Sequence, residues 1–119
     1  MPHAVIEYSE NLTDAMIESR TDLVGLVHGV MMGSGLFELS AIKTRAYGVD
    51  NWMVGEKGPD GKFIHVAVSL LSGRTLEQKQ NLSETLGKAL SKQVPQADSV
   101  TVEIRDMDKD TYRKYTPKD

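Results

Sequence analysis

Hydrophobic residues alternate with polar or small residues in several stretches of the chain, which is the pattern of a β-strand with one buried face. The clearest alternation spans residues 63–71, and a second spans residues 99–104. The apolar start of the chain predicts a buried strand over residues 2–8. Residues 36–52 also have strand-like composition, and a change of phase at Ala41-Ile42 predicts a β-bulge there. The apolar side of the clearest strand is formed by Ile64, Val66, Val68 and Leu70.

Two other stretches repeat apolar residues every three or four positions, as an amphipathic helix does. The first predicted helix spans residues 12–32 and ends before the glycines of Gly33-Ser34-Gly35. The second begins at a capping box, in which the side chains of Thr75 and Gln78 each bind a free backbone amide. Its apolar stripe continues towards Gln93, and Pro95 prevents a further turn.

These elements follow one another as strand, helix and strand in each half of the chain, residues 2–54 and 62–105. The turn signal Gly58-Pro59-Asp60-Gly61 separates the halves and predicts a hairpin that closes onto residues 63–71. A strand–helix–strand unit joins parallel strands, whereas the turn makes the two central strands antiparallel. We therefore predict one α+β domain over residues 1–119. It has a duplicated β-α-β order, a four-stranded mixed sheet with two helices on one face, and a polar C-terminal segment, residues 106–119.

The sheet face that the helices leave open bears on assembly. It includes Val5 or Ile6 and one phase of residues 63–71, so the pattern predicts apolar side chains there. A large apolar sheet face does not stay exposed to water in a monomer. The sequence therefore predicts a homo-oligomer that buries this face.

Composition narrows the class of protein. The chain has 119 residues, a formal net charge of −3 and no cysteine, which excludes disulfides, thiolate metal ligands and cysteine nucleophiles. His3 and His28 have no partners at zinc-ligand spacing, so no metal site is expected. The negative net charge argues against nucleic acid as a partner. No apolar run approaches the ~18 residues of a membrane span and no signal-peptide pattern is present, so we expect a cytoplasmic protein.

Pro2 is the candidate with the clearest chemistry. Removal of Met1, which precedes this small residue, would leave the secondary amine of Pro2 at the N-terminus. An α-amino group titrates near ~8, and burial or a nearby cation lowers that pKa towards neutrality, where a general base works best. Pro2 also suits a purely structural role, because proline is tolerated at the first position of a strand. Taken alone, the first two residues favour the structural role.

Three segments in combination point to a known family. They are Pro2-His3 with Ile6-Glu7-Tyr8-Ser9, then Val49-Asp50 with Trp52, and Gly73-Arg74-Thr75-Leu76-Glu77. Further matching residues are Asn11-Leu12, Gly35-Leu36-Phe37, Leu39, Ile42, Arg45, Phe63, His65 and Gln80. Over residues 2 to 105 the sequence resembles the 5-carboxymethyl-2-hydroxymuconate isomerase family of the tautomerase superfamily.

The resemblance implies a duplicated β-α-β fold, a homotrimer whose sheets face its interior, and a keto–enol isomerase that uses no metal or other cofactor. It implies that Pro2 is the general base and that the substrate is a small anion, an unsaturated 2-hydroxy acid with two or three carboxylates, met in the degradation of aromatic acids. Arg74 would bind one carboxylate, and Lys43 or Arg45 would bind another or polarise the developing 2-keto group. The family is expected to have arginine at Lys43, where lysine keeps the charge and loses the planar fork.

The predicted topology agrees with this arrangement of candidates. If the first and third strands are antiparallel, Pro2 lies near the loop that bears Arg74, and that loop starts a helix whose N-terminal amides favour anions. Without the resemblance, Arg74 suits a solvated loop position better than a binding one. Lys43 and Arg45 suit solvated surface positions equally well, and His65 suits a sheet or interface position better than a catalytic one.

Other classes of protein share the predicted order of elements. A βαββαβ chain also describes ferredoxin-like modules, including small ligand-binding regulatory domains that dimerise without catalysis. A trimer of the same fold without catalysis, a dehalogenase and a decarboxylase are further alternatives. A blocked N-terminus would leave a regulatory module intact and would silence an isomerase that uses the Pro2 amine.

Overall fold

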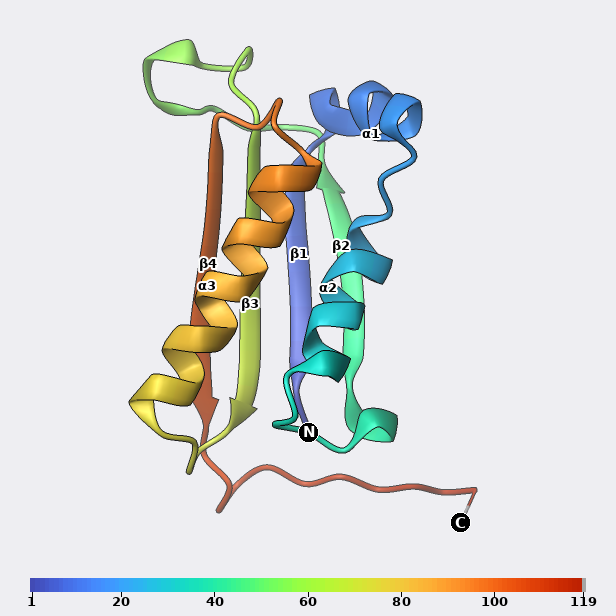
Figure 1. Cartoon of the computed structure of the whole chain (residues 1–119), viewed down its shortest axis with the longest axis vertical. Coiled ribbons are helices and arrows are strands. Elements are labelled where there is room, and N and C mark those ends of the chain that lie inside the picture. The colour runs from blue at the N-terminus through green and yellow to red at the C-terminus, as the bar shows by residue number, and fades with distance from the viewer. Residues whose placement is uncertain (119) are drawn as a thin grey trace.

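The computed structural model describes residues 1–118 of the chain (Figure 1). Short 3-10 helices lie in the connections at Glu10–Leu12, Leu39–Ala41 and Gly55–Lys57. None of the helices in this part of the chain has the length and apolar character needed to cross a membrane. The main elements are β1 (His3–Ser9), α1 (Thr13–Ser19), α2 (Leu23–Gly33), β2 (Lys43–Val49), β3 (Phe63–Leu71), α3 (Leu76–Gln93) and β4 (Ser99–Met107).

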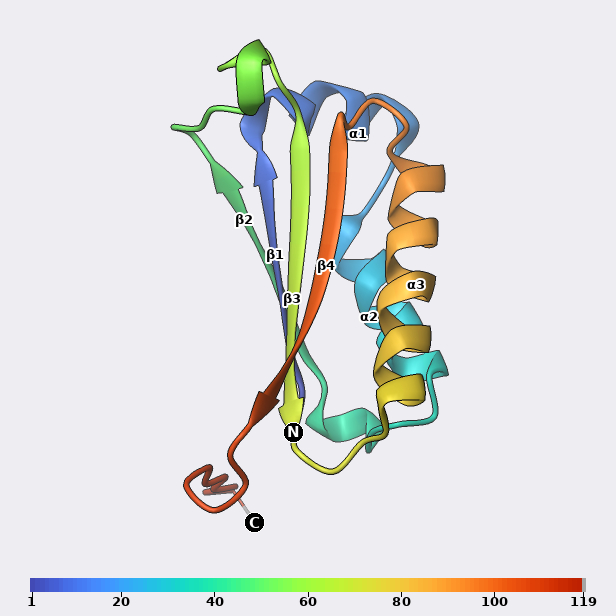
Figure 2. The ribbon, with the colours of Figure 1, turned by 90° about the vertical axis from the view of Figure 1, so that its left-hand side faces the viewer.

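The four strands form one mixed sheet in the order β2-β1-β3-β4. β1 is parallel to β2 and β3 is parallel to β4, while the central pair β1 and β3 is antiparallel. Each parallel pair is joined through helices, because parallel neighbours need a crossover rather than a tight turn. Figure 2 shows α2 and α3 on one face of the sheet, while the other face carries no long helix of the described residues. The predicted four-stranded mixed sheet with helices on one face is confirmed.

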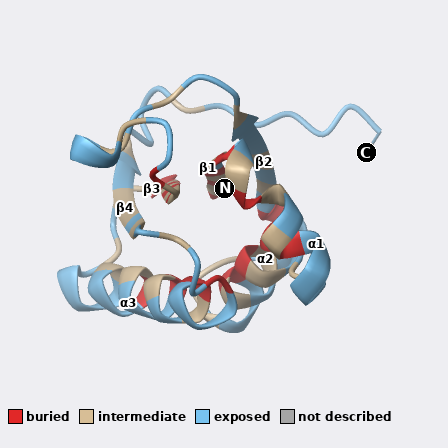
Figure 3. Cartoon of the chain, turned by 90° about the horizontal axis from the view of Figure 1, so that it is seen from above, coloured by how far each residue is buried: buried red, intermediate tan, exposed pale blue. Residues whose placement is uncertain are grey.

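The hydrophobic core lies between the sheet and the helices, where Figure 3 shows the buried residues gathered. The predicted apolar side of β3 faces this core, since alternate residues of the strand are fully buried. α2 and α3 contribute residues three or four positions apart, so each presents one stripe to the sheet. The fully buried side chains include Ile6, Val27, Met31, Ile64, Val66, Val68, Leu70, Leu86 and Leu90.

Helix α3 begins and ends where the sequence predicts. The N–H of Gln78 donates to Thr75 Oγ1 at 3.1 Å, and the N–H of Thr75 donates to Gln78 Oε1 at 2.9 Å, which is the predicted capping box. At the other end Val94 donates its N–H to the carbonyl of Leu90 at 2.8 Å. Pro95 follows directly and has no N–H with which to continue the helix.

The single helix predicted over residues 12–32 is wrong, because the chain forms two helices there. Arg20 has a φ of 56°, a left-handed conformation that ends α1. Asp22 then starts α2 by accepting a hydrogen bond from the N–H of Gly25 at 3.0 Å. The hydrophobic period did not reveal the break, because an aspartate in an amphipathic stretch suits an exposed helical position as well as an N-cap.

The extended stretch predicted over residues 36–52 and its hairpin are also corrected. β2 covers only Lys43–Val49, and the change of phase before it is a 3-10 turn at Leu39–Ala41 rather than a bulge. β2 and β3 do not pair with each other, because both pair with β1. The turn at residues 58–61 therefore belongs to a connection between strands on opposite sides of β1.

The open face of the sheet is mixed rather than apolar. Val5 lies on it and Ile6 faces the core, so one of the two predicted alternatives holds. Towards β4, however, His65 contacts Thr101 Oγ1 at 2.6 Å and Glu103 Oε1 at 3.0 Å, and Arg105 binds Glu103 at 2.6 Å. Arg105, and then His65, lower the pKa of Glu103 to about 2. The residues of β4 that alternate with its apolar positions include the charged Glu103 and Arg105, and these lie on the open face.

Candidate active site

The start of β1 lies at one end of the sheet and is enclosed by the rest of the chain. The Pro2 side chain is fully buried, and its carbonyl accepts a hydrogen bond from the N–H of Lys43 at 3.1 Å. Because β1 is antiparallel to β3, the register pairs His3 with Ser69, two residues before β3 ends. The loop after β3, which carries Arg74, therefore lies beside Pro2.

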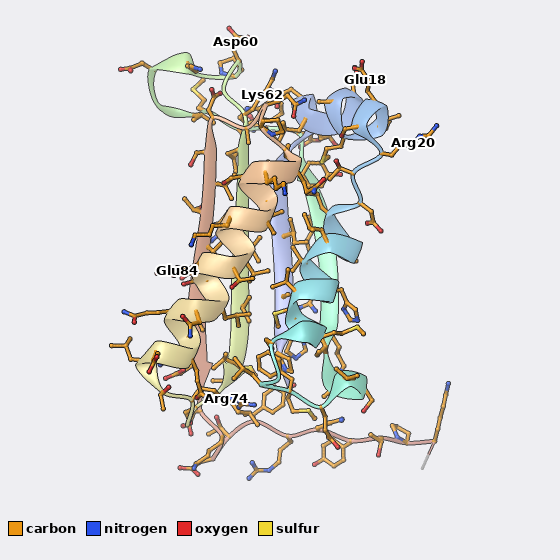
Figure 4. The ribbon with its side chains drawn as sticks, in the orientation of Figure 1. Glu18, Arg20, Asp60, Lys62, Arg74 and Glu84 are labelled. Atoms are coloured by element: carbon orange, nitrogen blue, oxygen red, sulfur yellow. The ribbon has the colours of Figure 1, made fainter. Side chains whose placement is uncertain are left out.

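Arg74 is held in place by contacts from two other parts of the chain. Its Nη1 donates to the carbonyl of Leu71 at 3.2 Å, and its Nη2 donates to the carbonyl of Leu36 at 2.8 Å. The guanidinium also lies 5.2 Å from the centre of the Phe37 ring. Figure 4 shows Arg74 at the end of the molecule where the chain starts. A guanidinium has five N–H donors, so several remain for an anion.

Lys43 is the second cation at this end of the sheet. It begins β2 next to β1, and the register pairs it with His3. Its side chain is exposed, and Nζ donates to the carbonyl of Ala41 at 3.3 Å. The position combines a backbone bond to Pro2 with a charged group that solvent or a ligand can reach.

Arg74 and Lys43 both act on the pKa of the N-terminal amine of Met1. The pKa of the Met1 amino group is lowered from its ordinary value of 8.0, first by burial and then by the charges of Arg74, Lys114 and Lys43. Glu38 acts in the opposite direction and raises this pKa. The nitrogen of Pro2 lies one residue further along, and consecutive Cα atoms are about 3.8 Å apart. An amine at Pro2 would therefore meet the same cations in a more buried position.

Arg45 is placed differently from the other predicted site residues. It lies on the same face of β2 as Lys43, as a two-residue spacing in a strand requires. Its Nη1 contacts Nδ1 of His3 at 3.2 Å. Burial lowers the pKa of His3, and the charges of Arg45, Lys43 and the N-terminal amine lower it further. Arg45 therefore reaches the start of β1 through His3, and its predicted contact with substrate stays a prediction.

Two residues at this end were not found from the sequence. Tyr112 Oη contacts His3 Nε2 at 2.9 Å, and Lys114 is near enough to lower the pKa of the Met1 amine. Both belong to the segment after β4, which crosses this end of the molecule (Figure 1). No signal in the sequence could have placed them, because a polar segment without periodicity does not indicate its course.

Other residues of the family resemblance lie at the opposite end of the sheet. Trp52 Nε1 and Asn11 Nδ2 both donate to the carbonyl of Gly61, at 2.9 Å and 3.0 Å. These bonds join the segment after β1, the segment after β2 and the approach to β3. Within one chain these bonds hold the fold at the end of the sheet away from Pro2.

A pocket of about 580 Å³ lies between α2 and α3 and shares Leu36 with the surroundings of Arg74. Its lining residues, among them Ser34, Gln78 and Asn81, are all uncharged. An anionic ligand would find no cation there, so we place the candidate site at the start of β1, around Pro2, Arg74 and Lys43. Among residues 1–118 there is no group of three histidine, aspartate or glutamate side chains arranged to hold a metal ion.

Comparison with known proteins identifies the family. The family model for 5-carboxymethyl-2-hydroxymuconate isomerase matches residues 2–116. The chain belongs to this family. A 5-carboxymethyl-2-hydroxymuconate Delta-isomerase of Escherichia coli is 33% identical over 89 residues, which are 72% of this chain and 67% of that protein. As a member of this isomerase family, the chain is an enzyme.

Solved structures show the same fold. A 5-carboxymethyl-2-hydroxymuconate isomerase from Deinococcus radiodurans R1 superposes with a TM-score of 0.80 at 23% identity, over 96% of this chain and 88% of that one. A symmetric trimer of fused 4-OT superposes with a TM-score of 0.72 at 23% identity, over 90% of this chain and 86% of that one. Both agree with the sheet and helix arrangement of the family member described here.

Proposed function

We propose that this chain isomerises 5-carboxymethyl-2-hydroxymuconate or a close 2-hydroxy di- or tricarboxylate, with the amine of Pro2 as general base. The observation that carries the proposal is the setting of the fully buried Pro2, next to the Met1 amine, whose pKa is lowered by burial and by Arg74, Lys114 and Lys43. A neutral amine can accept a proton, and the cations that keep it neutral also bind carboxylates. The reaction would take place in the degradation of aromatic acids.

The proposed reaction moves one proton. The Pro2 nitrogen takes it from the 2-hydroxyl of the substrate, the O–H bond electrons form the 2-keto group, and the conjugated double bonds shift. The same nitrogen returns the proton to a remote carbon, so the amine is restored and no cofactor is consumed. Arg74 pairs with one carboxylate, and Lys43, or Arg45 beside it on β2, binds another or polarises the 2-keto oxygen as charge develops.

Retention of Met1 decides whether this chemistry is available. With Met1 in place the Pro2 nitrogen is part of a peptide bond and has no basic lone pair. Removal of Met1 exposes the amine within the enclosed end of β1, where the Pro2 side chain is fully buried. Removal of Met1 is therefore part of the proposal.

The test is an ultraviolet assay of 5-carboxymethyl-2-hydroxymuconate and 2-hydroxymuconate isomerisation. It compares protein whose loss of Met1 is verified by intact mass with Pro2→Ala and with a form that retains Met1. We expect kcat/KM to fall by about 10²–10⁴-fold in the form that retains Met1, the usual contribution of general acid–base catalysis. Pro2→Ala should fall less, because its processed N-terminus is still an amine. Equal melting temperatures would show that the altered forms are folded. A Met1-retaining form as active as the processed protein would contradict the proposal for Pro2.

The same assay separates the isomerase from the other functions that the sequence allows. Family membership favours an enzyme over a ferredoxin-like binding module. Processed protein that turns over neither compound would remove the muconate substrates and leave the other tautomerase reactions.

We also propose that the working form is a homotrimer built across the open face of the sheet. The fused 4-OT neighbour is a symmetric trimer with the same fold. The edge strands β2 and β4 are unpaired on their outer sides in one chain, and unpaired strand edges invite association. Val5, Phe63 and Leu71 lie half-buried on the open face, where a second chain could cover them.

A further inference from the structure

The segment after β4 crosses the end of the sheet that holds the candidate site (Figures 1 and 2). It turns at Asp108, whose carbonyl accepts hydrogen bonds from the N–H groups of Thr111 at 3.1 Å and Tyr112 at 3.0 Å. The Asp108 side chain also accepts from the N–H of Asp110 at 2.9 Å. These bonds give residues 108–112 a defined turn that presents Tyr112 to the start of β1.

Tyr112 attaches the segment to His3. Besides the 2.9 Å contact between Tyr112 Oη and His3 Nε2, the two rings meet edge to face, with centroids 6.1 Å apart. Arg45 contacts the other ring nitrogen, Nδ1, at 3.2 Å. An arginine only donates hydrogen bonds, so Nδ1 must be the acceptor and His3 must be neutral. Its proton is then on Nε2 and is donated to Tyr112 Oη.

The hydrogen bond from His3 Nε2 to Tyr112 Oη holds the segment after β4 against the start of β1. Burial, then Arg45, Lys43 and the N-terminal amine, lower the pKa of His3, which agrees with a neutral ring at pH 7. Lys114 follows Tyr112 by two residues, and its charge, like that of Lys43, lowers the pKa of the Met1 amine. The charged groups that act on the amine are thus Arg74, Lys114, Lys43 and the opposing Glu38.

The two candidate substrates differ by one carboxylate, and the number of cations near the amine bears on which of them is bound. A 2-hydroxymuconate has two carboxylates, and a carboxymethyl substituent adds a third. Arg74 in the β3–α3 loop, Lys43 at the start of β2 and Lys114 in the segment after β4 all lower the pKa of the Met1 amine. The contact of Tyr112 with His3 at 2.9 Å holds the segment of Lys114 at this end of the sheet. Arg45 already contacts Nδ1 of His3. Arg74 and Lys43 then remain for a dicarboxylate, and a third carboxylate needs a third partner.

We propose that residues 108–118 form a wall of the active site and that Lys114 binds the carboxylate that a tricarboxylate has and a dicarboxylate lacks. Tyr112 is a positioning residue, because it acts on the substrate through the placement of Lys114. The inference rests on the proposed function and adds to it the residue that distinguishes the two substrate classes.

The decisive measurement is the ratio of kcat/KM for 5-carboxymethyl-2-hydroxymuconate to that for 2-hydroxymuconate. Lys114→Gln should lower this ratio about tenfold, because it removes one charge-assisted hydrogen bond from the tricarboxylate alone. Lys88→Gln removes the same charge from an exposed position of α3, outside the proposed wall, and should leave the ratio unchanged. An unchanged ratio in Lys114→Gln would overturn the proposal. Wild-type protein inactive on both compounds would instead contradict the proposed function itself.

Tyr112→Phe tests the attachment of the segment. Without Oη the proton of His3 Nε2 has no acceptor there, so the segment should detach and the substrate ratio should fall while Lys114 remains. The double variant Tyr112→Phe/Lys114→Gln should have the same ratio as Lys114→Gln, because both changes remove one interaction. A Tyr112→Phe protein that keeps the wild-type ratio, or losses that multiply in the double variant, would contradict the positioning role.

Discussion

At the scale of single residues, Arg74 combines structural contacts with the proposed binding of a carboxylate. Its guanidinium binds the carbonyls of Leu71 and Leu36 and lies over Phe37. A lysine at this position could bind one of these groups, but it lacks the planar fork that reaches two carbonyls and stacks on a ring. The order around the amine therefore depends on arginine in particular and not on positive charge alone.

Arg74→Lys should lower kcat/KM about 10- to 100-fold for both muconate substrates, because the bidentate, fixed carboxylate partner is lost. Arg20→Lys is the matched control, since Arg20 is exposed at the opposite end of the molecule (Figure 4), and it should leave the kinetics unchanged. Steady-state kinetics on the two variants at equal melting temperature make the comparison. Wild-type kinetics in Arg74→Lys would show that charge alone suffices at this position.

The dependence of kcat/KM on pH gives a second test of Arg74, through its effect on the pKa of the amine. The pKa of the Met1 amine is lowered by burial and by Arg74. The Pro2 amine of the processed protein would meet the same groups, so its neutral form should persist to lower pH than that of a free amine. kcat/KM should therefore rise as pH rises through the lowered pKa and then level off. Arg74→Ala removes a positive charge, the pKa should return towards 8.0, and the rising limb should move to higher pH. A limb at the same pH in both proteins would exclude Arg74 as a cause of the lowered pKa.

At the scale of elements, local signals were sufficient wherever a segment carries its own boundary. β3 matches its alternation over residues 63–71, and α3 lies between a capping box and Pro95. Between α1 and α2 the boundary depends on the left-handed Arg20 and the Asp22 cap, which a periodic pattern passes over. The connection between β2 and β3 likewise depends on which strand each of them pairs with.

Gly61 offers a test of how these connections are packed. It is buried, its carbonyl binds both Trp52 and Asn11, and a Cβ there would overlap the side chain of Val54. Gly61→Ala should lower the free energy of unfolding by about 1–3 kcal/mol, the usual effect of overpacking.

Gly29→Ala is the control for this substitution. Gly29 is exposed in α2 and a Cβ there meets nothing within 4 Å, so alanine should raise the free energy of unfolding by about 1 kcal/mol. Urea denaturation of both variants measures the two effects, and equal stabilities would contradict the packing described at Gly61. Residues beside Gly61 lie at the far end from Arg74 (Figure 4), so both variants should keep the wild-type pH profile.

At the scale of the whole molecule, the mixed open face concentrates its exposed aromatic surface at one edge. Tyr47 of β2 is 56% exposed and lies on the open face in the same phase as Lys43 and Arg45. Burial of this edge against another chain would also cover unpaired backbone groups of β2. The proposed trimer therefore has a contact that a charge should disrupt.

Sedimentation or light scattering should give the mass of three chains for the wild type. Tyr47→Asp should give a lower mass, because it would place a carboxylate in the buried contact. Ile17→Asp changes a residue that is 70% exposed on α1, away from the sheet, and should keep the trimer. A wild-type mass of one chain, or a trimer that persists in Tyr47→Asp, would contradict the proposed assembly.

The sequence by itself determined the strands with clear alternation and the capped helix α3, because each depends on residues close together in the chain. Through the family resemblance it also indicated Lys43 and Arg74 as candidate cations. Only the tertiary structure decided that β1 separates β2 from β3, that Arg45 meets His3, and that Tyr112 and Lys114 lie at the site. His3 and Tyr112 are 109 positions apart. Contacts at such separations arise when strands choose partners and the chain folds back, and no local pattern of hydrophobic and polar residues records that choice.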